Sequence, residues 1–179
     1  RVSGSSNQNL GIVPDVDMPS LIDKDEVGES SLPNALPWDE IDSAKYQRIS
    51  DIVPYLPQLR EKHARRIDTD PEFIYVESLR KLLDENRNRI ELSLNEKQRA
   101  ETQKALDQER LAIENQRRKA RGEEPFDSIK ALRDMEEQRA LDPESTDEAI
   151  DEDPYVRETG EILVDYMDLI REKQVARKG

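Results

Sequence analysis

The sequence predicts a mainly α-helical domain preceded by a short β-hairpin or strand segment. Two helix-start dipeptides, Asp70-Pro71 and Asp153-Pro154, and one capping-box pattern, Ser93-x-x-Glu96, support the helical part. In each, a short polar side chain can accept hydrogen bonds from free backbone amides, and Pro suits the first helical position. Only 4% of the 179 residues are aromatic and 39% are charged, so we expect a thin core that not all of the chain shares.

Residues 1–19 differ from the rest, because they contain Gly4, Gly11, Pro14 and short runs of β-branched residues. That composition is typical of strands and turns. A lone hairpin of this size is not stable in water, so we expect its partner sheet to lie outside the chain. Residues 20–35 are predicted to be an acidic linker and residues 36–179 a helical domain.

The helical domain is expected to begin with a turn or short helix over residues 38–46, followed by a helix over residues 57–68. The helix that opens at Pro71 places apolar residues three and four apart on one broad face. These residues are Phe73, Val76, Leu79, Leu82, Leu83 and Ile90. Later helices are expected over residues 95–121, with an end near Gly122, over residues 126–139, and from Pro154 onward, where Val156, Leu163, Tyr166, Met167 and Ile170 recur at helical spacing.

The long segment 95–121 is rich in charge and has few large apolar residues, namely Leu106, Leu111 and Ile113. Because Leu106 and Ile113 lie seven residues apart, they share a narrow face. We expect a solvated arm held by charge pairs four residues apart, the alternative being a thin seam that packs on a partner. The basic run Arg117-Arg118-Lys119-Ala120-Arg121 is expected to complement the helix dipole rather than to bind nucleic acid.

Composition excludes several classes of function. The net charge of -13 disfavours nucleic acid as a partner, and the absence of Cys excludes disulfides and thiolate metal sites. No apolar run approaches the roughly 18 residues that span a bilayer. The negative charge is concentrated in residues 14–43 and 142–154, which we interpret as solvated connectors. A weak divalent-cation site is the alternative for the acidic residues Asp147, Glu148, Asp151, Glu152 and Asp153.

The search for catalytic groups yields no candidate. A Ser-His-Asp triad would need His63, the single histidine, and its charged neighbours predict a surface position. Ser5 and Ser6 follow Gly4 but form no G-x-S-x-G elbow, and no Gly-rich phosphate loop or calcium loop is present. We therefore expect no catalytic, cofactor-binding or metal-binding residue, and an inactive chain when isolated.

The residues at the start of the chain resemble a strand of the carboxy-terminal processing peptidases. The matching positions are Ser3, Gly4, Ser6, Gln8, Gly11, Ile12, Pro14 and Asp15. The remainder is similar to the C-terminal region of the tail-specific protease branch of that family. This similarity is carried by Asn34-Ala-Leu-Pro-Trp-Asp-Glu-Ile-Asp42, Asp70-Pro-Glu-Phe73, Ser93-Leu-Asn95 and Asp153-Pro-Tyr155.

The resemblance implies a parent serine endopeptidase that processes or degrades envelope proteins from their C-termini in the bacterial periplasm. In that family a Ser nucleophile and a Lys base act beside a PDZ-like domain. Both catalytic residues precede the matched strand in the sequence. The dyad is therefore expected upstream of Arg1, and no Ser or Lys of this chain is assigned a catalytic role. Residues 1–19 would be the last strand segment of the protease domain, and residues 36–179 a helical domain that shapes substrate access.

The expected partners are the protease and PDZ-like domains of the parent and its protein substrates. An alternative function is an interaction module that docks an adaptor or lipoprotein through the charged helix 95–121. Burial of Leu106 and Ile113 within the chain would favour the structural role, and their exposure would favour docking. A third alternative is a free helical scaffold whose motif matches are accidental.

Overall fold

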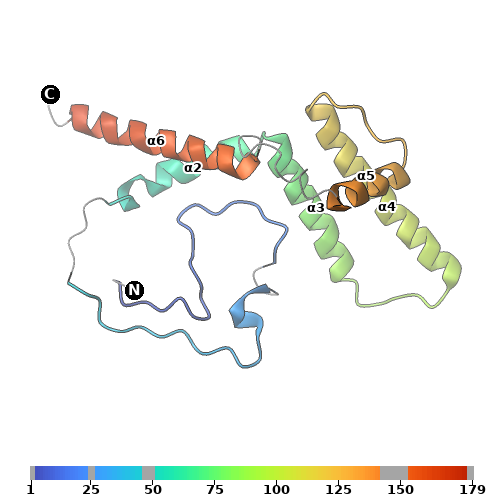
Figure 1. Cartoon of the computed structure of the whole chain (residues 1–179), viewed down its shortest axis with the longest axis horizontal. Coiled ribbons are helices and arrows are strands. Elements are labelled where there is room, and N and C mark those ends of the chain that lie inside the picture. Colours follow the sequence, from blue (N-terminus) through green and yellow to red (C-terminus); the bar gives the residue numbers. More distant parts are fainter. Residues whose placement is uncertain (1–2, 24–26, 46–50, 142–152, 177–179) are drawn as a thin grey trace.

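The computed structural model describes residues 3–23, 27–45, 51–141 and 153–176. Within these ranges the chain is mainly helical and forms no strand, which confirms the predicted fold class. Figure 1 shows two groups of helices placed end to end, α2 with α6 and α3 with α4 and α5. The elements in chain order are η1 (Glu29–Ser31), η2 (Val53–Tyr55), α2 (Leu56–Ile67), α3 (Pro71–Arg87), α4 (Glu96–Ala120), α5 (Ile129–Leu141) and α6 (Pro154–Ala176).

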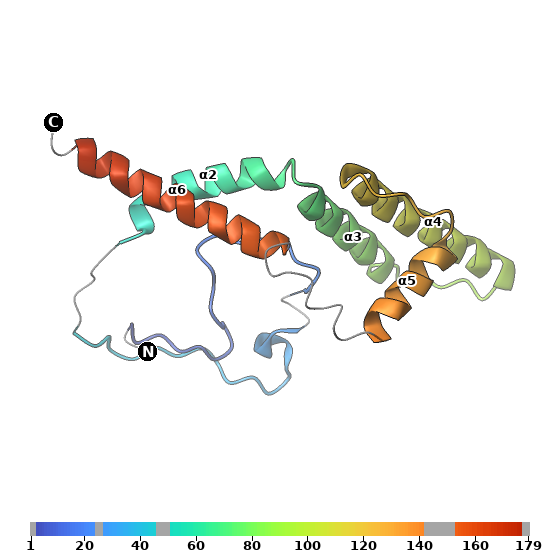
Figure 2. The same ribbon diagram turned by 45° about the horizontal axis from the view of Figure 1, so that its top comes forward.

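Helices α2 and α6 pack antiparallel. Tyr55, just before α2, contacts the ring of Tyr166 late in α6, with ring centroids 5.4 Å apart, whereas Arg66 at the other end of α2 contacts Glu158 early in α6. Helices α3 and α4 form an antiparallel hairpin, and α5 crosses α4 (Figure 2). In both views residues 3–23 and 27–45 lie in an open arrangement along one side of α2 and α6.

The predicted helix boundaries at Asp70, Asp153 and Gly122 are confirmed. Asp70 Oδ1 accepts a hydrogen bond from the Glu72 amide at 2.8 Å, and Asp153 Oδ1 accepts one from the Tyr155 amide at 2.7 Å. Gly122 ends α4 with φ +73°. The next amide, at Glu123, reaches back five residues to the Arg118 carbonyl at 2.8 Å, which is the Schellman arrangement that glycine favours.

The predicted capping box at Ser93 is wrong. Helix α4 begins two residues later than that box requires, and Asn95 is its cap, with Oδ1 accepting from the Lys97 amide at 2.9 Å. Asn caps a helix as well as Ser does, so the adjacent Asn95 competes with Ser93. The Ser93 hydroxyl instead bonds Gln98 Oε1 and accepts from the Asn95 amide.

The other helices differ from prediction in their bounds. The helix expected over 57–68 is α2, displaced by one residue. The helix expected over 126–139 begins at Ile129, because the Asn115 side chain binds both backbone groups of Phe126, at 2.7 and 2.9 Å, and holds it in the preceding turn. Residues 38–45 form no helix, and Tyr46 lies outside the described residues.

Residues 38–41 instead pair with the start of the chain. Ser5 and Glu40 form an isolated antiparallel bridge, and the Trp38 indole donates to the Ser6 carbonyl at 3.2 Å. Gly4 has φ +88°, and a Cβ built there would lie 2.0 Å from the Ile41 carbonyl oxygen, so only glycine fits. The hairpin expected within 1–19 is therefore not formed in the described residues, whose pairing partner is the segment around Glu40.

The core of the described residues is as thin as the composition predicts. Its buried apolar side chains are Leu56 and Leu59 of α2, Phe73 of α3 and Leu132 of α5. The chain exposes 14325 Å², whereas a compact monomer of this mass would expose about 8,900 Å². Many helix faces are consequently left open to solvent.

The prediction of a solvated arm over 95–121 is confirmed for residues 96–105, which are exposed except for Thr102, and is wrong for the rest of α4. Glu114 is buried, and Leu106, Leu111 and Ile113 are half-buried between α3 and α5. Several ion pairs of α4 join it to the neighbouring helices α3 and α5. These pairs are Arg117–Glu72, Arg110–Glu136 and Asp107–Arg133. These cross-helix pairs allow a narrow apolar stripe to pack, because long charged side chains cover apolar surface with their stems.

The broad apolar face predicted for α3 is only partly buried, since Leu83 is 43% exposed. We therefore expect Leu132→Ala, at a site 2% exposed, to lower the free energy of unfolding by about 2–5 kcal/mol. Leu83→Ala should cost about 1 kcal/mol or less. Urea unfolding of the two variants beside the parent chain measures both, and equal large losses would contradict this view of the core.

Candidate functional site

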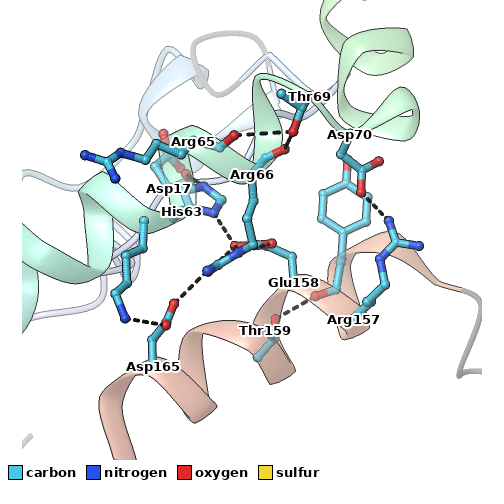
Figure 3. Close-up of polar contacts among 12 residues, drawn as sticks. Asp17, His63, Arg65, Arg66, Thr69, Asp70, Arg157, Glu158, Thr159 and Asp165 are labelled. Carbon is cyan, nitrogen blue, oxygen red and sulfur yellow. Dashed lines mark hydrogen bonds and ion pairs between the residues drawn. The ribbon is translucent and has the colours of Figure 1, made fainter. Parts of the chain in front are cut away.

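A cluster of charged and polar side chains fills the interface between α2 and α6 (Figure 3). At its centre is His63, which is 4% exposed, and Glu158, which is 5% exposed. The predicted surface position of His63 is therefore wrong. Its helix places it four residues after Leu59 and seven after Leu56, on the buried face of α2, and its charged sequence neighbours point elsewhere.

Both ring nitrogens of His63 face oxygen atoms. Nδ1 lies 2.8 Å from Glu158 Oε1, and Nε2 lies 3.1 Å from the carbonyl oxygen of Asp17. A carbonyl oxygen can only accept, so Nε2 donates to Asp17, and Nδ1 lies within hydrogen-bond distance of the Glu158 carboxylate. Both ring nitrogens are therefore engaged in contacts within the chain.

The negative partner, Glu158, also binds Arg66. The Arg66 Nε and Nη2 atoms donate to the Glu158 carboxylate at 2.9–3.1 Å, and Nη1 donates to Asp165 at 2.6 Å. The hydrogen bonds that Arg66 donates to Glu158 raise the pKa of Arg66 further above its ordinary value. Lys62 completes the group by donating to Asp165 at 2.8 Å. Each buried charge is therefore paired, which is the condition for tolerating it.

This cluster holds the backbone of residues 15–19, which we call the strap. Arg60 Nε donates to the Asp15 carbonyl at 2.9 Å, His63 donates to the Asp17 carbonyl, and the Tyr155 hydroxyl donates to the Pro19 carbonyl at 2.8 Å. The three contacted carbonyls belong to alternate residues, and the donors come from both helices. We call the donors and their ion pairs the clamp: Arg60, Lys62, His63, Arg66, Tyr155, Glu158 and Asp165.

The N-terminus of α6 joins the clamp to the second group of helices. Arg157 pairs with Asp70, the residue that caps α3, and the Tyr155 ring packs edge-on against Phe73 with centroids 5.5 Å apart. Asp70 thus both caps α3 and contacts α6, and Phe73 both packs in the core and contacts α6. The strap, the α2–α6 pair and the start of α3 form one connected structure.

The remaining residues singled out from the sequence are engaged in structural contacts. The Ser5 hydroxyl donates to Glu40, and the Ser6 hydroxyl accepts from the Gln8 amide. In the basic run, Arg117 pairs with Glu72 and lies over the Tyr75 ring, while Arg118 lies over the Phe126 ring. These arginines bind within the chain rather than only complementing the helix dipole.

The acidic candidates for a cation site fall mainly outside the described residues, namely Asp147, Glu148, Asp151 and Glu152. The described member, Asp153, caps α6. Over the described ranges, no group of three or more His, Asp or Glu side chains is arranged to hold a metal ion. A hollow of about 200 Å³ between α3 and α4 is lined mostly by apolar atoms, and Arg117 at its wall is paired with Glu72.

Sequence reasoning missed the clamp. The spacing of residues in α2 could have indicated that His63 is buried. Leu56, Leu59 and His63 follow one another at steps of three and four residues and therefore share one face. On α6, Glu158 and Asp165 are seven residues apart and also share a face. The contact between the two helices joins His63 to Glu158, which are 95 residues apart in the sequence. No local pattern predicts such a contact.

The ion pairs of Asp165 in the clamp make the free energy of unfolding depend on pH. Burial alone raises the pKa of Asp165, but hydrogen bonds from Lys62 and Arg66 outweigh it and hold that pKa below its ordinary value. Since the folded pKa is the lower one, the stabilisation is complete above the unfolded pKa of about 3.9 and is lost as the pH falls through the folded value.

We therefore expect Asp165→Asn to be less stable than the parent chain at pH 7, with the difference shrinking as the pH falls below about 4. Urea unfolding across this range measures it. Asp168→Asn is the matched control, because Asp168 lies on the same helix and is largely exposed. A difference that stays constant with pH, or one that the control reproduces, would contradict the role of Asp165.

Comparison with known proteins places the chain in a family. Residues 22–168 match the family described as the C-terminal domain of tail specific protease. The tail-specific protease of Haemophilus influenzae is 39% identical over 141 residues, which is 76% of this chain and 19% of that relative. The chain thus spans about a fifth of the relative's length. In the described part of the chain, no helix is both long and apolar enough to cross a membrane. With most of its length matched, the chain belongs to the family of C-terminal domains of tail-specific proteases.

Proposed function

We propose that this chain is the non-catalytic C-terminal helical part of a tail-specific serine endopeptidase and that it shapes the access of protein substrates to the protease domain. Residues 1–19 are the last strand segment of that protease domain, 20–35 the linker and 36–179 the helical domain. The Ser–Lys dyad belongs to the remainder of the parent. No residue of this chain has a catalytic, cofactor-binding or metal-binding role.

The observation that carries this proposal is the hold of the clamp on the strap. The strap begins at Asp15, the last matching position of the segment that resembles a protease strand, and three side chains from two helices fix its backbone. A second attachment, between Ser5 and Glu40, ties the same segment to the beginning of the helical domain. Two attachments on one connecting segment restrict how the helices can lie relative to the protease domain.

The packing of α4 supports the structural role over docking of an adaptor or lipoprotein through 95–121. Ile113 faces α3 across the hollow between the two helices, and Glu114 is buried. The side of α4 that a docking partner would need is therefore occupied within the chain. The family membership supports a bacterial envelope protease that acts on protein C-termini in the periplasm, with the protease and PDZ-like domains as partners.

A test uses the full parent protease with the strap loosened at both ends by Arg60→Ala and Tyr155→Phe. These changes remove the donors to the Asp15 and Pro19 carbonyls and retain His63, Glu158 and the Tyr155 ring. We expect kcat/KM for a protein substrate with an apolar C-terminus to change by about fivefold or more, or roughly 1 kcal/mol. Hydrolysis of a short peptide should stay within about twofold.

The matched control is Arg65→Ala, since Arg65 is an exposed residue of α2 whose ion pair is to Glu61. Equal changes on the protein and the peptide would show an effect on the catalytic centre rather than on access. No change on either substrate would contradict the proposal. The isolated 179-residue chain should cleave neither substrate above a buffer control.

A further inference from the structure

The connection between α3 and α4 presents three apolar side chains to solvent. Ile90 is 97% exposed, Leu92 is 78% exposed and Leu94 is 99% exposed. They alternate with the polar residues Glu91 and Ser93. Isolated exposed apolar residues are common on protein surfaces, but these three stand at every second position and form one short apolar row.

The backbone of this connection is also unpaired. Residues 90–94 belong to no helix, and none of their amides donates a hydrogen bond to another described residue. The two flanks are fixed, because the Arg89 amide donates to the Asn86 carbonyl at 3.3 Å and Asn95 caps α4. The helical hairpin therefore presents a short segment with free amides between two anchored ends.

Alternation of apolar and polar residues is the pattern of a strand with one buried face. Successive side chains of a strand point to opposite faces, which would place Ile90, Leu92 and Leu94 together and Glu91 and Ser93 on the other side. An extended segment whose amides and carbonyls are unpaired can form backbone hydrogen bonds with the edge strand of an open sheet. Side-chain pattern and free backbone thus specify the same kind of partner.

We propose that residues 90–94 add as an edge strand to a β-sheet elsewhere in the same protease polypeptide, with Ile90, Leu92 and Leu94 against an apolar face beside that edge. The proposal rests on the proposed function, in which this chain is part of a longer protease. The relative at 39% identity is matched over 19% of its length, so most of such a polypeptide lies outside the described residues. The excess of exposed surface over that of a compact monomer is consistent with this occupant.

A second copy of the chain is a poorer occupant. Each copy carries a net charge of -13, and like charge on both partners opposes self-association. The segment itself contains a single charge, Glu91, and on the strand pattern this residue lies on the polar face away from the sheet it would join. The free energy of docking would come from the apolar face and the backbone bonds.

Hydrogen exchange of the full parent protease tests the proposal. We expect the amides of alternate residues in 90–94, those that would point to the neighbouring strand, to exchange at least about 100-fold more slowly than in an unstructured peptide of the same sequence. Exchange at the unstructured rate would overturn the proposal. Protection that disappears when the protease is diluted about 100-fold would also overturn it, because the occupant would then be a second copy.

Two matched variants test which face of residues 90–94 is buried against the sheet. Leu92→Asp places a charge on the proposed buried face, and Ser93→Asp places the same charge on the opposite face one residue away. We expect Leu92→Asp to abolish the protection of 90–94 and Ser93→Asp to keep it within about threefold. Equal protection in both variants would overturn the proposed orientation. If Leu92→Asp fails to fold, the exchange of the unmodified protease still decides.

The two proposals can fail separately. If loosening the strap changes cleavage of the protein substrate while residues 90–94 exchange freely, the proposed function stands and the edge-strand inference is wrong. If 90–94 are protected and the strap variants alter neither substrate, the edge strand stands and the access role is wrong.

Discussion

Helices α2 and α6 pack around the side chain of Glu158, which is almost inaccessible to solvent, and the arrangement of these two helices and the strap depends on it. Glu158 binds His63 and Arg66 at once, and His63 uses its remaining nitrogen on the strap. Removing one member would leave a buried polar group with a hydrogen bond unmade, which is more costly than losing an exposed ion pair. The network therefore fixes three segments, α2, α6 and the strap, with few apolar contacts.

The same use of charge extends to the second group of helices. The fully buried apolar side chains are few, and α4 is held between α3 and α5 largely by ion pairs such as Arg117–Glu72 and Arg110–Glu136. Partly buried pairs of this kind need well-fixed geometry to stabilise a fold, and Arg117 gains it by lying over the Tyr75 ring, 4.6 Å from the ring centre. A chain with 39% charged residues can thus form a defined structure while leaving much of its surface exposed.

What could be predicted from sequence was local. The caps at Asp70 and Asp153 and the glycine end at Gly122 depend on residues within one turn, and they are confirmed. The capping box at Ser93 was wrong because an equally good cap, Asn95, lies two residues away. The burial of His63, the packing of α4 and the pairing of Ser5 with Glu40 depend on contacts between distant segments, and composition alone does not determine them. No local residue pattern marks a catalytic site, and the protease family is indicated by the resemblance and by the comparison with known proteins.

The central claim is that His63 and Glu158 act as one buried unit, and a double-mutant cycle tests it most directly. Urea unfolding of His63→Ala, Glu158→Ala and the double variant should give a coupling energy of about 2 kcal/mol or more. The exposed pair Glu61–Arg65 of α2 is the comparison, and its coupling should not exceed about 0.5 kcal/mol. Additive effects of the His63 and Glu158 substitutions, within about 0.5 kcal/mol, would show that the two residues do not form the unit on which this account depends.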